Sequence, residues 1–96
     1  MVKNSFDIDQ FVAALTPEKA KDNLVNRFVM RRKELHYSQM KLASLSGVSY
    51  GSLRRFETSG DISLSSLMNL ANVLGYLEDF ENLFERPAIR SLKEMK

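Results

Sequence analysis

The sequence predicts an all-α protein, and three observations support this prediction. Proline and glycine are scarce, with only two and four copies in 96 residues, so few positions would break a helix. Runs of β-branched residues are short, and no strictly alternating apolar–polar segment extends beyond about four residues. Several apolar-periodic segments are preceded by serine or threonine, and some are followed by glycine, as helix caps would be.

Composition and length indicate one soluble globular domain. The chain is 44% hydrophobic and 27% charged, and 96 residues suffice for a single modest core. The absence of cysteine excludes disulfides, thiolate metal sites and cysteine nucleophiles. The longest apolar run, residues 11–15, is far shorter than the roughly 20 residues that span a bilayer. Asp7 and Asp9 would not suit a secretory signal. We therefore expect a cytoplasmic protein.

The N-terminal third is predicted to form two helices. A short helix covers about residues 6–15, and Thr16 followed by Pro17 has the pattern of an N-cap and a first helical residue. The second helix is expected to extend from Pro17 to His36. Its apolar stripe also contains Arg32, and a charge on an apolar face requires an acidic partner. The apolar members of this stripe are Leu24, Val25, Phe28 and Leu35.

Four more helical segments follow, at residues 39–46, 50–58, 64–74 and 77–84. Ser38, Ser49 and Ser63 stand directly before the first three segments as N-caps. Gly47 and Gly75 close the first and the third. The residues expected to face the core are Met40, Leu42, Ala43, Leu45, Val48, Leu53, Phe56, Leu64, Leu67, Leu70, Ala71 and Leu74.

Charge is strongly segregated along the chain. Between Arg27 and Arg55 there are seven basic residues and one acidic residue, whereas from Phe56 to Glu85 there are six acidic residues and no basic one. A net charge of +2 conceals a basic half of about +6 and an acidic half of about −6. Adjacent arginines on a short helix suggest a surface that meets nucleic acid, and the acidic half would then point away from it.

A short glycine-containing turn joins the segments 39–46 and 50–58, which is the helix-turn-helix arrangement. The motifs around it are Ser38-Gln39, Leu42-Ala43, Gly47-Val48-Ser49, Leu53, Arg55-Phe56-Glu57, Ile62-Ser63-Leu64 and Leu67 through Gly75. In these motifs the chain resembles the lambda-repressor-like, Cro-type (XRE) family of DNA-binding domains. The resemblance implies a five-helix domain at residues 24–85, with an N-terminal extension at 1–23, which includes the extra helix, and a basic tail at 86–96.

The resemblance also supplies a partner for Arg32. In the family, an arginine of the first core helix pairs with the glutamate that ends the third, and Arg32 and Glu57 occupy those positions here. Such a pair would fix the angle of the helix that enters the DNA groove. The alternative is a surface charge pair, which would contribute only about 0–1 kcal/mol.

DNA contacts follow from the same correspondence. Arg55 is the strongest candidate for reading a base, because a guanidinium can bond to O6 and N7 of guanine together. Gly51 departs from the family, whose repressors often carry a polar side chain there, so it either permits a closer approach or reduces the number of bases read. The alternative for the arginines is a solvated helix face. The expected base-reading residues are Tyr50, Gly51, Arg54 and Arg55, and the expected phosphate-binding residues are Gln39, Lys41, Ser49, Ser52 and Thr58.

The last segment is expected to form a twofold dimer interface through Leu77, Phe80, Leu83 and Phe84, the alternative being that it closes the core of a monomer. The expected function is a sequence-specific transcriptional regulator of bacterial or phage origin, a repressor that binds double-stranded DNA as a homodimer on an inverted repeat. Resemblance to HipB-type antitoxins offers an alternative, a protein that neutralises a kinase-like toxin and represses its own operon. No catalytic motif and no cluster of metal ligands is present, so no enzymatic activity, cofactor or metal is expected. Because the core is formed by five helices of a small domain, little room is left for a buried pocket, and no small-molecule ligand is expected either.

Overall fold

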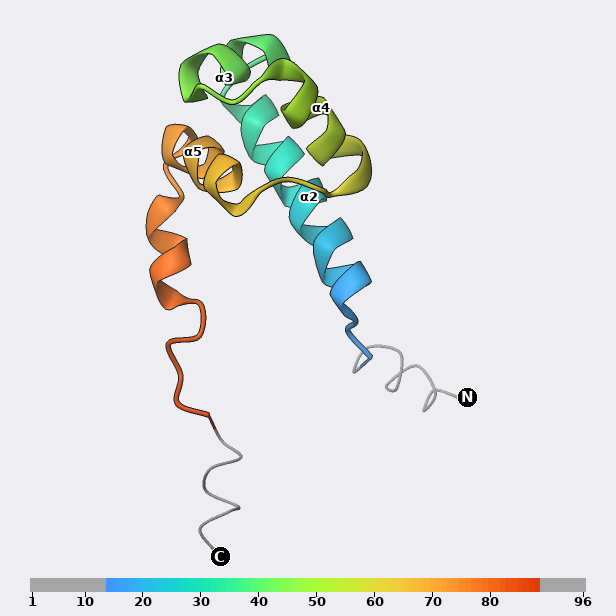
Figure 1. Cartoon of the computed structure of the whole chain (residues 1–96), viewed down its shortest axis with the longest axis vertical. Helices are drawn as coiled ribbons and strands as arrows, with labels where there is room; N and C mark the ends of the chain where they lie inside the picture. The colour runs from blue at the N-terminus through green and yellow to red at the C-terminus, as the bar shows by residue number, and fades with distance from the viewer. Residues whose placement is uncertain (1–13, 89–96) are drawn as a thin grey trace, which may run out of the picture.

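The computed structural model describes residues 14–88, and this part of the chain contains helices and no strand (Figure 1). The all-α prediction is therefore confirmed. The expected helix at residues 6–15 lies outside the described residues except for its last two positions, and so does most of the basic tail. The elements are α2 (Pro17–Glu34), α3 (Gln39–Ser46), α4 (Tyr50–Ser59), α5 (Leu64–Leu74) and the 3₁₀-helix η1 (Leu77–Asn82).

All four predicted N-caps form. The Thr16 hydroxyl accepts a hydrogen bond of 3.0 Å from the Lys19 amide, and Pro17 is the first residue of α2. Ser38, Ser49 and Ser63 accept equivalent bonds of 3.0, 3.1 and 3.1 Å from the amides three residues later. Each bond satisfies a backbone donor that the start of a helix would leave unpaired.

Three helices end at a glycine in the left-handed conformation, which a residue with a Cβ adopts only at a steric cost. The predicted C-caps Gly47 and Gly75 have φ angles of 78° and 92°. Gly60, which was not predicted as a cap, ends α4 with a φ of 82°. The helix α4 consequently extends one residue beyond its predicted end.

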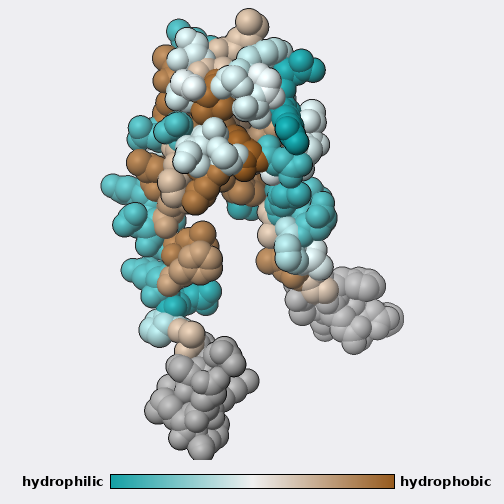
Figure 2. Space-filling model, viewed as in Figure 1, coloured by the Kyte–Doolittle hydropathy of each residue, from teal (hydrophilic) through white to brown (hydrophobic). Residues whose placement is uncertain are grey.

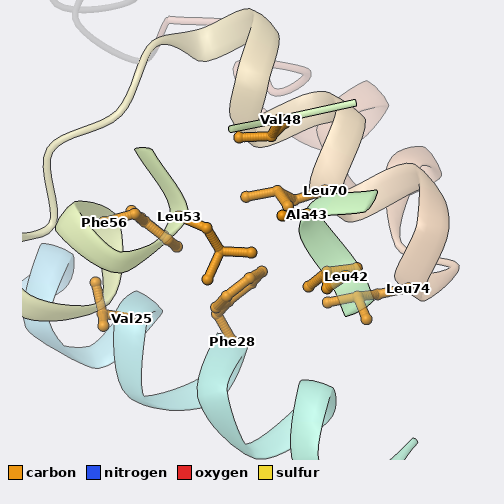
Figure 3. Close-up of a cluster of buried hydrophobic side chains, with 9 residues drawn as sticks. All are labelled: Val25, Phe28, Leu42, Ala43, Val48, Leu53, Phe56, Leu70 and Leu74. Atoms are coloured by element: carbon orange, nitrogen blue, oxygen red, sulfur yellow. The ribbon is translucent and has the colours of Figure 1, made fainter. Parts of the chain in front are cut away.

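The core lies where α3, α4 and α5 pack together over α2 (Figure 3). Leu42, Leu53 and Leu70, one from each of the three upper helices, are fully buried at 0% exposure. The rings of Phe28 and Phe56 meet edge to face with centroids 5.0 Å apart, which joins α2 to α4. The other buried apolar residues of the cluster are Val25, Ala43, Val48 and Leu74.

Several residues predicted to face the core are exposed, which corrects the sequence analysis. On α2 the buried stripe consists of Val25, Phe28 and Arg32, whereas Leu24 and Leu35 are exposed. The predicted stripe was too wide, because a helix lying on so small a core buries only a narrow face. The exposed residues on α3 and α5 are Met40, Leu45 and Leu64.

The two ends of the predicted helical pattern also differ from the structure. α2 ends at Glu34 and not at His36, which adopts a positive φ of 62°. The segment predicted as a helix over residues 77–84 is a 3₁₀-helix that stops at Asn82, after which Phe84 has a positive φ of 68°. Among the described helices, none is long and apolar enough to cross a membrane.

The first turns of α2 belong to the folded domain. Lys21 lies over the end of α4, where a Cβ on Gly60 would be only 2.8 Å from its Cγ atom. Its ammonium forms an ion pair of 3.6 Å with Asp61. The proposed boundary between residues 23 and 24 thus falls inside a continuous helix whose N-terminal part contacts the α4–α5 connection.

Candidate nucleic-acid interface

One side of α4 is buried in the core, and the opposite side is exposed to solvent. Leu53 and Phe56 are 0% and 1% exposed. Tyr50, Gly51, Arg54 and Arg55, the four residues predicted to read bases, are all exposed. The structure therefore brings these four residues together on the solvent side of a helix whose opposite side is fixed.

The two arginines of this surface keep their charges available. Arg54 lies over the ring of Tyr50, with its guanidinium carbon 5.5 Å from the ring centroid. A cation–π contact at an exposed site contributes about 0.5–1 kcal/mol, enough to restrain the side chain without neutralising it. Within residues 14–88, neither Arg54 nor Arg55 has an acidic group at ion-pair distance. A cationic surface without internal partners is suited to phosphates and to the acceptor atoms of guanine.

The hydroxyl groups around α4 already form intramolecular bonds. Ser49 accepts from the Ser52 amide and donates a 2.9 Å bond to the Ser52 hydroxyl. Thr58 lies in the last turn of α4 and donates to the carbonyl oxygens of Arg54 and Arg55 at 3.1 and 3.2 Å. Because the Thr58 proton is used within the helix, this hydroxyl is less suited to donate to a phosphate than the sequence suggested.

Gln39 and Lys41 occupy the first turn of α3. Lys41 is exposed, and among the described residues its ammonium has no acidic partner at ion-pair distance. Gln39 is half-buried, and its amide nitrogen donates a 2.7 Å bond to Oε1 of Glu57. This bond fixes the amide at the start of α3, where free backbone N–H groups and the helix dipole favour an anion. The second amide proton and the amide oxygen stay available.

Arg32 and Glu57 form a buried, two-bonded ion pair. Arg32 Nε donates to Glu57 Oε2 at 2.7 Å and Arg32 Nη2 to Glu57 Oε1 at 2.9 Å. Their side chains are only 9% and 8% exposed, so the pair is unlike the weak surface pair considered as the alternative. Arg32 Nη1 also donates to the carbonyl oxygen of Tyr37 at 2.9 Å. The pair thereby ties α4 to α2 and to the start of α3.

Sequence reasoning missed two members of this network, the Tyr37 carbonyl and the Gln39 amide. Gln39 and Glu57 are 18 positions apart, and Tyr37 participates through its backbone. The Gln39 bond depends on how α3 packs against α4, and the Tyr37 bond depends on how the backbone turns between α2 and α3, so neither has a signal in the sequence. The network shows that the amide expected to bind phosphate is held by the same carboxylate that orients α4.

Two shallow hollows border α4. One, of about 250 Å³, is lined by Gly51, Arg54, Arg55 and Thr58. The other, of about 300 Å³, lies between α4 and the start of α5 and is lined by Ser52, Arg55, Asp61, Ile62, Ser63 and Ser66. Within the described part of the chain, no cluster of three histidine or acidic side chains could hold a metal ion.

A comparison with protein families matches residues 30–80 to a family described as Helix-turn-helix, of the Cro/C1 (XRE) type. This match covers the end of α2, all of α3, α4 and α5, and most of η1. Searches of curated proteins and of solved structures gave no match.

Proposed function

Because the chain belongs to the XRE-type helix-turn-helix family of DNA-binding transcription regulators, we propose that it represses transcription as a homodimer bound to an inverted repeat. The observation that carries this proposal is the exposed surface of α4. Among residues 14–88, Arg54 and Arg55 have no acidic partner at ion-pair distance, and the buried pair of Arg32 and Glu57 holds the helix behind them. The family consists of DNA-binding proteins and not of enzymes.

In the proposed complex, α4 lies in the major groove and the start of α3 contacts the DNA backbone. Arg55 bonds to O6 and N7 of a guanine, and Arg54 with Tyr50 contacts a neighbouring base or phosphate. Gln39 and Lys41 bind phosphate at the first turn of α3. Ser49 and Ser52 offer further phosphate contacts at the start of α4. Thr58 is the weakest of the proposed contacts, because its proton is bonded within the helix.

The dimer part of the proposal rests on the C-terminal segment. Leu77, Leu83 and Phe84 are 41%, 62% and 92% exposed, so they do not close the core of this chain, and Phe80 is half-buried. This segment extends away from α4, and Figure 2 shows apolar surface exposed along it beside hydrophilic surface. A twofold axis through this segment would pair two α4 helices with half-sites about 34–36 Å apart.

The exposed apolar residues of the C-terminal segment would also suit an alternative, the binding of a partner protein. An antitoxin that neutralises a kinase-like toxin needs such a docking surface in addition to its DNA-binding helix. The homodimer is the arrangement proposed here, because two copies of the same exposed segment can pair about a twofold axis without a second protein.

Replacement of Phe84 tests the dimer. Since Phe84 is 92% exposed, Phe84→Asp should leave the fold intact and weaken dimerisation by about 2 kcal/mol, or ~30-fold in the dissociation constant. Leu64→Asp is the matched control, because Leu64 is 63% exposed but lies on α5, outside the segment. Sedimentation velocity over a concentration series measures both. A wild type that stays monomeric throughout would refute the dimer and leave the surface to a partner protein.

Replacement of Arg55 tests base recognition. Arg55→Ala should cost about 1–3 kcal/mol on the specific duplex and little on random duplex, because a base contact is lost. Gln39→Ala should weaken binding to both duplexes alike, because phosphate contacts carry no sequence information. Fluorescence anisotropy on paired duplexes measures the two variants. Equal losses for Arg55→Ala on both duplexes would show that Arg55 contacts only the backbone.

A further inference from the structure

Gly51 differs from the other glycines of the chain. Gly47, Gly60 and Gly75 cap helices with positive φ angles, so their backbone explains their identity. Gly51 is the second residue of α4 and is not among the positive-φ residues. Its backbone is helical, a conformation that alanine adopts more favourably by about 1 kcal/mol.

No neighbour within the described structure requires a glycine at this position. Apart from its two chain neighbours and the adjacent backbone of α4, no heavy atom of the described residues would lie within 4 Å of a Cβ built on Gly51. The contrast with Gly60 is direct, because a Cβ there would press on the Lys21 side chain at 2.8 Å. Neither the backbone conformation nor the packing of the described residues explains why position 51 is a glycine. The explanation therefore lies in the molecule that this surface binds.

The missing side chain opens a hollow on the free side of α4. The hollow of about 250 Å³ is lined by Gly51, Arg54, Arg55 and Thr58, which share one helix face at the spacing i, i+3, i+4 and i+7. Arg54 is drawn toward the Tyr50 ring, and the Thr58 hydroxyl is bonded to backbone carbonyls. The groups left to line the hollow are therefore mainly the bare Gly51 backbone and the aliphatic parts of Arg54, Arg55 and Thr58.

We propose that this hollow receives the C5-methyl group of a thymine, beside a guanine bonded by Arg55. The inference rests on the proposed function, because it assumes that α4 lies in the major groove. The thymine methyl is the apolar group that base pairs project into that groove. It is compact enough to enter a hollow that a single added Cβ would partly fill. Gly51 then determines specificity by the side chain that it lacks.

The test combines one change in the protein with one change in the DNA. A binding site is first selected from a random duplex library with the wild-type protein, and each thymine in it is then replaced by uracil, which removes only the methyl group. At one thymine in each half-site, replacement by uracil should weaken wild-type binding about fourfold. This factor corresponds to the ~0.8 kcal/mol gained by burying one methylene-sized group. Uracil at the other thymines serves as the control.

Gly51→Ala should abolish this discrimination. Its own methyl takes up the part of the hollow next to position 51, so the variant should bind the thymine and uracil duplexes with about equal affinity and the thymine duplex more weakly than the wild type does. Its melting temperature should be at least that of the wild type, since alanine favours the helix. Equal losses on both duplexes would overturn the inference and indicate a close backbone approach instead.

The outcomes separate this inference from the proposed function. A selected motif in which every uracil replacement is neutral for the wild type overturns the thymine pocket and leaves sequence-specific binding intact. Recovery of no motif by the wild type overturns both.

Discussion

Glu57→Ala is expected to lower the free energy of unfolding by about 3–5 kcal/mol, because it leaves the guanidinium of Arg32 buried without its counter-charge. The Arg32 side chain is 9% exposed and loses the bonds from Nε and Nη2 in this variant. Only its bond to the Tyr37 carbonyl would persist. Urea unfolding monitored by circular dichroism measures the loss.

The double variant Arg32→Met/Glu57→Leu is the matched control. Replacing a buried ion pair by apolar residues of similar volume is often neutral or stabilising, so this variant should recover most of the lost stability. It should still bind DNA less well than the wild type, because Gln39 loses the carboxylate that holds its amide. A loss below about 1 kcal/mol for Glu57→Ala would mean that the pair behaves as an exposed surface pair.

Phe56→Ala is expected to cost about 3–5 kcal/mol, through lost burial and the cavity left behind. Phe56 is 1% exposed, and its ring meets that of Phe28 edge to face at 5.0 Å. This contact links α4 to α2, so the variant should lose both stability and the orientation of α4. Thermal unfolding checks the stability.

Phe56→Leu separates packing from the aromatic contact. Leucine refills most of the cavity but cannot form the edge-to-face pair, which is worth about 0.5–1.5 kcal/mol beyond its buried area. Its cost should therefore be clearly smaller than that of the alanine variant. Equal costs for the two variants would show that the ring contact, and not the filled volume, stabilises this site.

Local signals predicted most of the helix boundaries. The caps Thr16, Ser38, Ser49 and Ser63 were identifiable because a capping hydroxyl and the amide it binds are three residues apart in the chain. The fully buried Leu42, Leu53 and Leu70 were likewise expected from periodicity. Properties that depend on neighbours in the sequence were thus predictable.

Properties that depend on the size and shape of the core could not be predicted from the sequence. Met40 and Leu64 continue an apolar pattern, but they are 66% and 63% exposed because none of the elements within residues 14–88 covers them. Periodicity cannot show how much of a helix face the other helices reach. The predicted bounds and type of the helix after Gly75 were wrong for a related reason. Over so few residues, its pattern of apolar residues fits a 3₁₀-helix as well as an α-helix.

In the candidate site, too, local properties were predictable from the sequence and contacts between helices were not. Helical spacing relative to Leu53 and Phe56 predicted that Tyr50, Arg54 and Arg55 point outward, and the structure shows all three exposed. It did not reveal that Gln39 bonds to Glu57, because that contact joins two helices across 18 positions. The hollow lined by Gly51, Arg54, Arg55 and Thr58 was equally hidden, since it depends on how the side chains of α4 lie around Gly51.

Recognition of a DNA sequence by α4 can be measured by comparing binding to two duplexes. Fluorescence anisotropy would compare the duplex upstream of the protein's own gene with a scrambled duplex across a salt series. We expect preference for the upstream duplex that persists at physiological salt, with log K falling against log salt at a slope of about −7 if a dimer makes roughly eight phosphate contacts. Equal, salt-sensitive binding to both duplexes, or no binding to either, would contradict sequence recognition by α4.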